Sequence, residues 1–212
     1  RGKCKGCGKS ISWRYPLVEM ITGILFALVT YVFIIVNTET WFLLTNLLQL
    51  LGLLSFFATS LALALIDIDH YRLPTKIIIY GTLSTLLLYG SSSVILRDWS
   101  NLLFALVGGV AAYLFFLVIH LVVPNGMGKG DVNLAGLIGL VLGWVSVGTL
   151  LTGLFLGFLF GALFGIGLIL AKKGNRKSAI PFGPWMILGS WVGLAFGDAI
   201  WFGYLSLNGI FT

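Results

Sequence analysis

Long apolar runs, separated by short polar stretches, dominate this sequence of 212 residues. About 20 apolar residues in a row are enough for a helix to cross the hydrocarbon core of a bilayer. With 58% hydrophobic residues, 9% charged residues and a mean hydropathy of +1.04, the chain is far more apolar than a soluble domain. We therefore predict an all-α polytopic membrane protein with seven transmembrane helices, at residues 17–36, 42–66, 77–96, 102–123, 132–145, 150–171 and 184–205.

Two of these segments have unusual features. The segment 132–145 is short: it would rise about 21 Å as a helix, less than the ~30 Å of the hydrocarbon core, and we expect its inner end to begin below the membrane surface. In the last two segments glycine recurs at every fourth position, and small residues on one helix face allow close helix packing in lipid. We expect a packing surface at Gly153, Gly157, Gly161 and Gly165, and another at Gly189, Gly193 and Gly197.

The positive charges predict how the chain is oriented, because cytoplasmic loops are enriched in Lys and Arg. With the N-terminus inside, the inner segments hold every Lys and Arg except Arg97, out of a total of 13. We therefore expect the N-terminus in the cytoplasm and the C-terminus outside. The net charge of +6 is explained by this topology and by contact with anionic membrane lipids, without a nucleic-acid partner.

The stretch Gly-Met-Gly-Lys-Gly-Asp at 126–131 places glycines and a carboxylate just before an apolar segment. Glycine permits positive φ and close approach of another chain, so Gly128 and Gly130 suggest a special backbone. Asp131 would lie at a helix N-terminus, where the helix dipole favours an ionised carboxylate. The alternative is a flexible turn that ends in an N-capping aspartate.

Two further carboxylates, Asp67 and Asp69, end the segment 42–66 on the same side of the membrane as Asp131. Two carboxyl groups that share a site cannot both ionise at low cost, so one holds a proton and the other does not. An aspartic protease needs this state, because one group takes a proton from water while the other polarises the scissile carbonyl. The alternative is that Asp67 and Asp69 are interfacial residues paired with Arg72 or Lys76.

Three stretches resemble, in order, the signatures of the type IV prepilin peptidases, which are bacterial GxGD aspartic proteases: 66–74, 126–131 and 181–184. The stretch from Arg1 to Glu19 is similar to the segment that precedes the second membrane span of that family. The resemblance implies cleavage of prepilins or pseudopilins at the cytoplasmic membrane face, after a glycine that ends a basic leader. It implies Asp67 and Asp131 as the catalytic pair in the bacterial inner membrane, with supporting roles for Asp69, Gly128, Lys129 and Gly130.

The resemblance also divides the chain and bears on its cofactors. It implies a cytoplasmic basic segment, 1–14, and a transmembrane aspartic peptidase domain, 15–212. Members commonly have eight spans, so we expect that the first one is missing here. Cys4 and Cys7 form one Cys-x-x-Cys pair, which is half of the four ligands that tetrahedral zinc needs, or else two reduced thiols. Proteolysis by carboxylates requires no cofactor. Many members also methylate the new N-terminus, and S-adenosylmethionine is expected only if that activity is present.

Two other function classes use the same features. A proton- or ion-coupled transporter would bind its ion at intramembrane carboxylates, and a scaffold subunit of a pilus or secretion machine would carry out no chemistry. The roles of Glu19 and Asp198 stay open: Glu19 suits the first turn of a helix, and Asp198 suits a polar contact between helices or an outer water pocket. We expect His120 to be a hydrogen-bonded structural residue.

Overall fold

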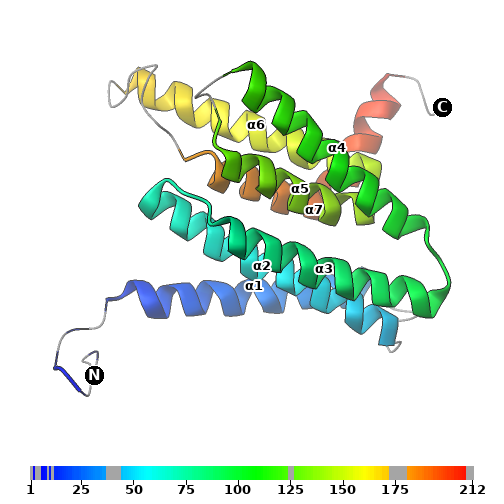
Figure 1. Ribbon diagram of the computed structural model, residues 1–212, viewed down its shortest axis with the longest axis horizontal. Helices are drawn as coiled ribbons and strands as arrows, with labels where there is room; N and C mark the ends of the chain where they lie inside the picture. The colour runs from blue at the N-terminus through cyan, green and yellow to red at the C-terminus, as the bar shows by residue number, and fades with distance from the viewer. Residues whose placement is uncertain are drawn as a thin grey trace.

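The computed structural model describes residues 2, 6–8, 10, 12–36, 44–123, 127–171 and 181–208. Within this part of the chain lie seven α-helices (Figure 1), as the sequence predicted. Their bounds are α1 Arg14–Val36, α2 Leu44–His70, α3 Thr75–Leu96, α4 Ser100–Val122, α5 Lys129–Val145, α6 Val147–Leu170 and α7 Gly183–Leu207.

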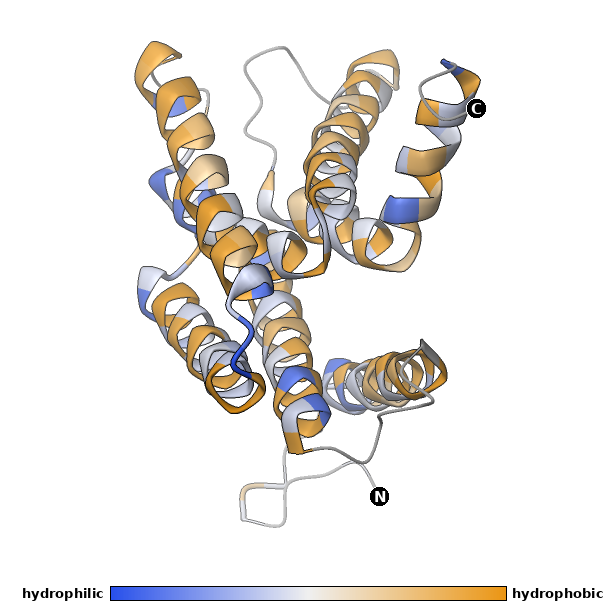
Figure 2. Ribbon diagram, turned by 90° about the vertical axis from the view of Figure 1, so that its right-hand side faces the viewer, coloured by the Kyte–Doolittle hydropathy of each residue, from blue (hydrophilic) through white to orange (hydrophobic). Residues whose placement is uncertain are grey.

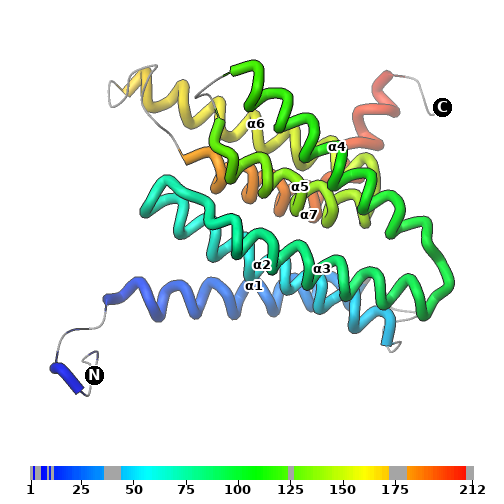
Figure 3. Tube along the Cα trace, viewed as in Figure 1, coloured from blue at the N-terminus to red at the C-terminus, as the bar shows by residue number. Residues whose placement is uncertain are grey.

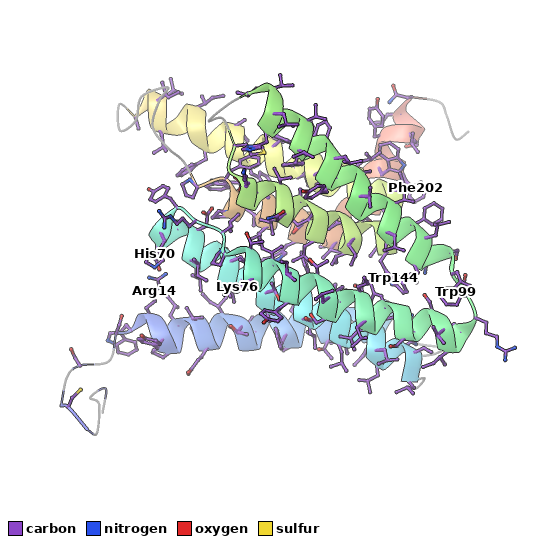
Figure 4. All side chains as sticks on the ribbon, viewed as in Figure 1. Arg14, His70, Lys76, Trp99, Trp144 and Phe202 are labelled. Atoms are coloured by element: carbon purple, nitrogen blue, oxygen red, sulfur yellow. The ribbon has the colours of Figure 1, made fainter. Side chains whose placement is uncertain are left out.

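Successive helices run in opposite directions along the bundle (Figures 1 and 3). The end of α2 and the starts of α3, α5 and α7 therefore lie at one end of the molecule, which is also where α1 begins. Figure 4 shows Arg14, His70 and Lys76 towards this end and Trp99 at the other. We call it the basic end, because Arg14, Arg72, Lys76 and Lys129 all belong to segments that meet there.

Six of the described helices are long and apolar enough to cross a membrane, and α5, with 17 residues, is the short one. Most residues of the helices are apolar (Figure 2), and many large apolar side chains are exposed, including Phe104, Leu114 and Phe155. Exposure of apolar side chains to water is unfavourable in free energy, so these faces are suited to contact with lipid. The chain is a multi-pass membrane protein.

Helix α5 forms the centre of the described bundle. It packs against α3, α4, α6 and α7, and its side chains are buried along nearly its whole length, including Leu134, Leu137, Ile138 and Leu142. A helix that is buried on all sides is expected to be apolar all round. The central position of α5 places the residues of its first turn in the interior of the basic end.

Two glycine seams hold the helices together. Between α6 and α7, a Cβ on Gly193 would lie 2.6 Å from the Cα of Gly153, and a Cβ on Gly189 would overlap the backbone of Gly157. These contacts confirm the predicted packing at Gly153, Gly157, Gly189 and Gly193, whereas no contact in the described part of the chain tests Gly165. Between α4 and α5, a Cβ on Gly108 would lie 2.7 Å from the carbonyl oxygen of Gly139, so this pair also packs backbone to backbone.

Two helix ends differ from the prediction in ways that concern the site. Helix α2 continues to His70 rather than stopping at residue 66, so Asp67 lies inside its last turn. It ends because Tyr71 takes the left-handed conformation (φ 52°), with its N–H bonded to the carbonyl of Asp67 at 2.8 Å. Helix α5 begins at Lys129 rather than at 132, which makes Asp131 its third residue.

Candidate active site

Asp67 is a buried carboxylate near the end of α2, with 5% of its surface exposed. Its Oδ2 accepts a hydrogen bond of 3.1 Å from the backbone N–H of Gly183, the first residue of α7. The first N–H groups of a helix have no partner within the helix, so the carboxylate satisfies one of them. A Cβ on Gly183 would lie 2.8 Å from the same oxygen, and glycine is therefore the residue that lets α7 start here.

Asp131 lies in the first turn of α5, and 9% of its surface is exposed. Its Oδ2 accepts a hydrogen bond of 3.0 Å from the N–H of Gly128, and its own N–H donates to the carbonyl of Gly128 at 3.1 Å. The carboxylate thus closes the first turn of α5, at the positive end of the helix dipole. The alternative of a flexible turn with an N-capping aspartate does not describe this geometry, because Asp131 lies within the helix.

The two carboxyl groups lie near the same side chain, Leu73. Leu73, in the turn between α2 and α3, packs against Gly130, which precedes Asp131, and against Gly183, which is bonded to Asp67. A Cβ on Gly130 would be 2.7 Å from Leu73 Cβ, and a Cβ on Gly183 would be 3.2 Å from Leu73 Cδ1. The glycines on either side of Leu73 therefore let α5 and α7 approach the end of α2. The fold brings Asp67 and Asp131 together at the basic end, from segments far apart in the sequence.

The glycines of the 126–131 stretch act through close packing rather than through unusual dihedral angles. Gly128 has φ −74°, and the glycines with positive φ in the described chain are Gly2 and Gly8. The expectation of positive φ at Gly128 and Gly130 was thus wrong. Their common property is the missing Cβ, which leaves space for Leu73 at Gly130 and for the Asp131 carboxylate at Gly128. Gly126 lies outside the described residues.

Asp69 faces away from the pair. Its carboxylate makes a two-pronged ion pair with Arg14 at the start of α1, with Nη1–Oδ1 and Nη2–Oδ2 distances of 2.9 and 2.6 Å. The alternative that Asp67 and Asp69 pair with Arg72 or Lys76 is wrong for Asp69, whose partner is on another helix. Lys129 is exposed and makes no ion pair with any described residue.

His120, near the end of α4, makes a hydrogen bond, as the sequence predicted. Its Nδ1 lies 2.7 Å from the carbonyl oxygen of Met127, the residue before Gly128. As a donor, the imidazole ties the end of α4 to the loop whose next N–H binds the Asp131 carboxylate. The sequence marked His120 as structural but did not indicate that it supports this loop.

The other candidate residues lie apart from the pair. Asp198 accepts a hydrogen bond from the hydroxyl of Ser146, which also caps α6 by accepting the Thr149 N–H at 2.9 Å. This arrangement confirms the predicted polar contact between helices. Glu19 is exposed on α1.

The described residues do not by themselves form a metal site. Cys7 is an exposed free thiol, whereas Cys4 lies outside the described residues. No group of three His, Cys, Asp or Glu side chains within the described chain is arranged to hold a metal ion. Tetrahedral zinc needs four ligands, and the described part supplies one thiol.

Comparison with known proteins gives matches along the chain. The type IV leader peptidase family model matches residues 53–166, and the bacterial peptidase A24 N-terminal domain model matches residues 1–33. Three relatives carry the name prepilin leader peptidase/N-methyltransferase. The relative from Aeromonas salmonicida is 36% identical over 97% of this chain and 66% of its own length. The relative from Pseudomonas aeruginosa is 33% identical over 98% of this chain and 67% of its own length. The relative from Bacillus subtilis is 30% identical over 94% of this chain and 73% of its own length.

The chain spans about two thirds of the length of these relatives. No solved structure matches it significantly. The first family model covers more than half of the chain, including both Asp67 and Asp131, and the relatives match nearly all of it. The chain therefore belongs to the type IV leader peptidase family.

Proposed function

We propose that this protein is an aspartic endopeptidase that removes the basic leader from prepilins or pseudopilins at the cytoplasmic face of the bacterial inner membrane. The observation that carries the proposal is that Asp67 and Asp131 are both buried beside Leu73 at one end of an apolar bundle, in a chain of this family. The relatives' shared name supports the substrate class.

In the proposed reaction the two carboxyl groups share one proton and hold a water molecule between them. The ionised carboxylate takes a proton from the water as the water oxygen attacks the scissile carbonyl carbon. The protonated carboxyl gives its proton to the carbonyl oxygen, and a tetrahedral intermediate forms. When this intermediate collapses, the C–N bond breaks and the leaving amine takes a proton from one carboxyl group. A hydroxyl of the tetrahedral intermediate returns a proton to the other carboxylate as the C=O bond re-forms. The resting state is then restored.

The contacts around each carboxylate support these roles. Gly183 donates its N–H to Asp67, and Gly128 donates its N–H to Asp131, each to Oδ2. A fixed donor on one oxygen restricts the rotation of the carboxyl group, so that the other oxygen is available for water. Asp69, Gly128, Lys129 and Gly130 act in support in this proposal: the two glycines provide the close packing, and Asp69 anchors α1 to the end of α2.

The transporter alternative has no support from the family or from the position of the carboxylates. A coupling-ion site is expected near the middle of the membrane. Asp67 lies in the last turn of α2 and Asp131 in the first turn of α5, so both are at the basic end. A scaffold without chemistry would not require two buried carboxylates held by fixed donors.

We also propose that the N-terminus and the basic end face the cytoplasm, since most of the Lys and Arg residues belong to segments on that side. Proteolysis is proposed to need no metal. Cys4 and Cys7 are proposed as half of a zinc site, separate from the peptide-cleaving pair. N-methyltransferase is part of the relatives' name, and S-adenosylmethionine enters the proposal only if that activity is present.

Coexpression with a prepilin in cells that lack their own peptidase tests the proposal. Leader removal, followed by immunoblot and by the mass of the pilin N-terminus, is expected with the unchanged chain and absent with Asp67→Asn or Asp131→Asn. The matched control is Asp98→Asn, since Asp98 is an exposed acid between α3 and α4, at the far end of the bundle. The transporter and scaffold alternatives predict no leader removal by any of these proteins.

A further inference from the structure

A groove of about 480 Å³ runs between α3 and α4, with α5 as its floor. Helices α3 and α4 are joined at the far end of the bundle and diverge towards the basic end, and α5 lies between them (Figure 1). Along α3 the groove extends from Thr75 to Leu86, a rise of about 16 Å or three helical turns. Its walls are mostly apolar, with Ile79 and Leu83 on α3, Leu106 and Val110 on α4, and Leu140 on α5.

The inner end of the groove meets the candidate active site. Thr75 and Asn133 line this end. Asn133 follows Asp131 by two residues on α5, and Thr75 follows Leu73, the side chain that lies between Gly130 and Gly183. Residues two apart lie about 200° apart around a helix, so Asn133 and Asp131 are on different faces of the first turns of α5. A substrate segment that leaves the groove at its inner end would pass around the start of α5 to reach the aspartates.

Three polar side chains that line this groove, Thr75, Tyr113 and Asn133, have no hydrogen bond to a described residue, and Asn133 alone among the three carries two donors on one group. Its half-buried carboxamide makes no hydrogen bond to any described residue, whereas the hydroxyl of Thr82 donates to the carbonyl of Ile78 in its own helix at 2.8 Å. An amide that faces lipid without a partner is costly, because lipid tails offer no hydrogen bonds. The carboxamide offers both donors and an acceptor, which match the two polar groups of a peptide unit.

These observations distinguish between two occupants. A lipid acyl chain would fill the apolar walls but leave Asn133 unpaired. A membrane helix that unwinds at its inner end would fill the walls with its side chains and present free N–H and C=O groups beside Asn133. A scissile bond must leave its helix to reach the two carboxyl groups, so a peptidase substrate has such groups at this depth.

We propose that the groove between α3 and α4 holds the hydrophobic helix of the prepilin, and that Asn133 binds the unwound backbone next to the scissile bond. This proposal rests on the proposed peptidase function. It predicts which face of α3 touches the substrate.

Photocrosslinking tests the location. The full chain carries Asp131→Asn to keep the substrate uncleaved, together with a benzophenone amino acid in place of Leu83 or of Tyr80. Leu83 is 57% exposed and lines the groove, whereas Tyr80 is 72% exposed on the same helix and does not line it. The proposal predicts prepilin adducts from position 83 and few from position 80. Equal yields, a preference for position 80, or adducts with lipid alone at position 83 would overturn it.

Cleavage rates test the role of Asn133. The loss of one hydrogen bond to the substrate backbone is expected to lower kcat/KM about ten-fold in Asn133→Leu. The control is the same substitution at Asn101, an exposed residue in the first turn of α4 at the far end. Equal rates in the two variants would contradict the role. If the unchanged chain removes no leader at all, the peptidase proposal itself has failed, so the two failures are distinguishable.

Discussion

The backbone N–H of Gly183, at the start of α7, donates a hydrogen bond of 3.1 Å to Oδ2 of Asp67, near the end of α2. The residues are far apart in the sequence, and this contact joins the first and the third of the predicted signature stretches. It also shows why the third stretch belongs to the site: it supplies a fixed donor to one of the two carboxylates.

Gly183→Ala is expected to reduce leader removal by about ten-fold or more, because the new methyl group would lie 2.8 Å from the Asp67 carboxylate and displace it. Gly203→Ala is the control on the same helix, since a Cβ there meets no atom within 4 Å. The measurement is the initial rate of cleavage of a purified prepilin in detergent. Equal rates for the two variants would show that the contact with Gly183 does not position Asp67.

Gly189→Val is expected to destabilise the bundle by about 1–3 kcal/mol or more, because the branched side chain would meet the backbone of Gly157. The matched substitution Gly167→Val, on α6, places its Cβ in open space and is expected to leave the unfolding midpoint nearly unchanged. Unfolding in mixed detergent micelles measures both. If the two variants unfold alike, the seam between α6 and α7 does not hold the helices together.

His120→Ala is expected to lower the cleavage rate about ten-fold, with little change in stability, because it frees the loop that presents Gly128 to Asp131. His120→Asn keeps a donor near the position of Nδ1 and should recover part of the rate. The comparison of kcat and KM for the two variants is the test. A rate unchanged in His120→Ala would mean that the loop is held by other contacts.

Arg14→Gln and Asp69→Asn break the same ion pair, so the double variant is expected to cleave no more slowly than the slower single variant. Each single change should have a small effect, because the pair is half exposed and screened by solvent. Cleavage rates of the four proteins at low and high salt provide the measurement. Effects that multiply would show that Asp69 acts on the site independently of Arg14.

The double variant Cys4→Ser, Cys7→Ser is expected to retain leader removal, and a zinc chelator is expected to have no effect on the rate. The physical reason is that the proposed reaction uses two carboxyl groups and water, while Cys7 is an exposed thiol in the segment before α1. Cleavage assays with and without chelator measure this. Loss of proteolysis in the double variant would give the cysteines a part in the peptidase.

The sequence was sufficient to predict the helices and the end of the bundle at which Asp67 and Asp131 lie. Apolar runs of membrane length identify helices, and the alternation of their direction places Asp67 and Asp131 at the same end. Glycines at every fourth residue identified the α6–α7 seam, because their spacing puts them on one helix face. The sequence also indicated that α5 is short, although its burial at the centre of the bundle depends on the other helices.

What the sequence did not predict are contacts between distant segments. Leu73 lies between Gly130 and Gly183, and no local pattern relates these residues. The partner of Asp69 is Arg14 on another helix, although closer basic residues were available in the sequence. The glycines before Asp131 suggested both positive φ and close approach of a neighbouring chain. The structure shows the close approach, but the sequence did not indicate that Leu73 is the neighbour. Each of these contacts depends on how the helices pack in three dimensions, which no local sequence pattern specifies.

The most direct test of the account is the cleavage rate of Asp67→Asn, Asp131→Asn and the double variant, measured with purified protein and one prepilin. Two groups that share a proton act as a unit, so each single change should lower the rate by about 10²-fold or more, and the double variant should be no slower than either. Substantial cleavage by either single variant, or effects that multiply in the double variant, would contradict the account.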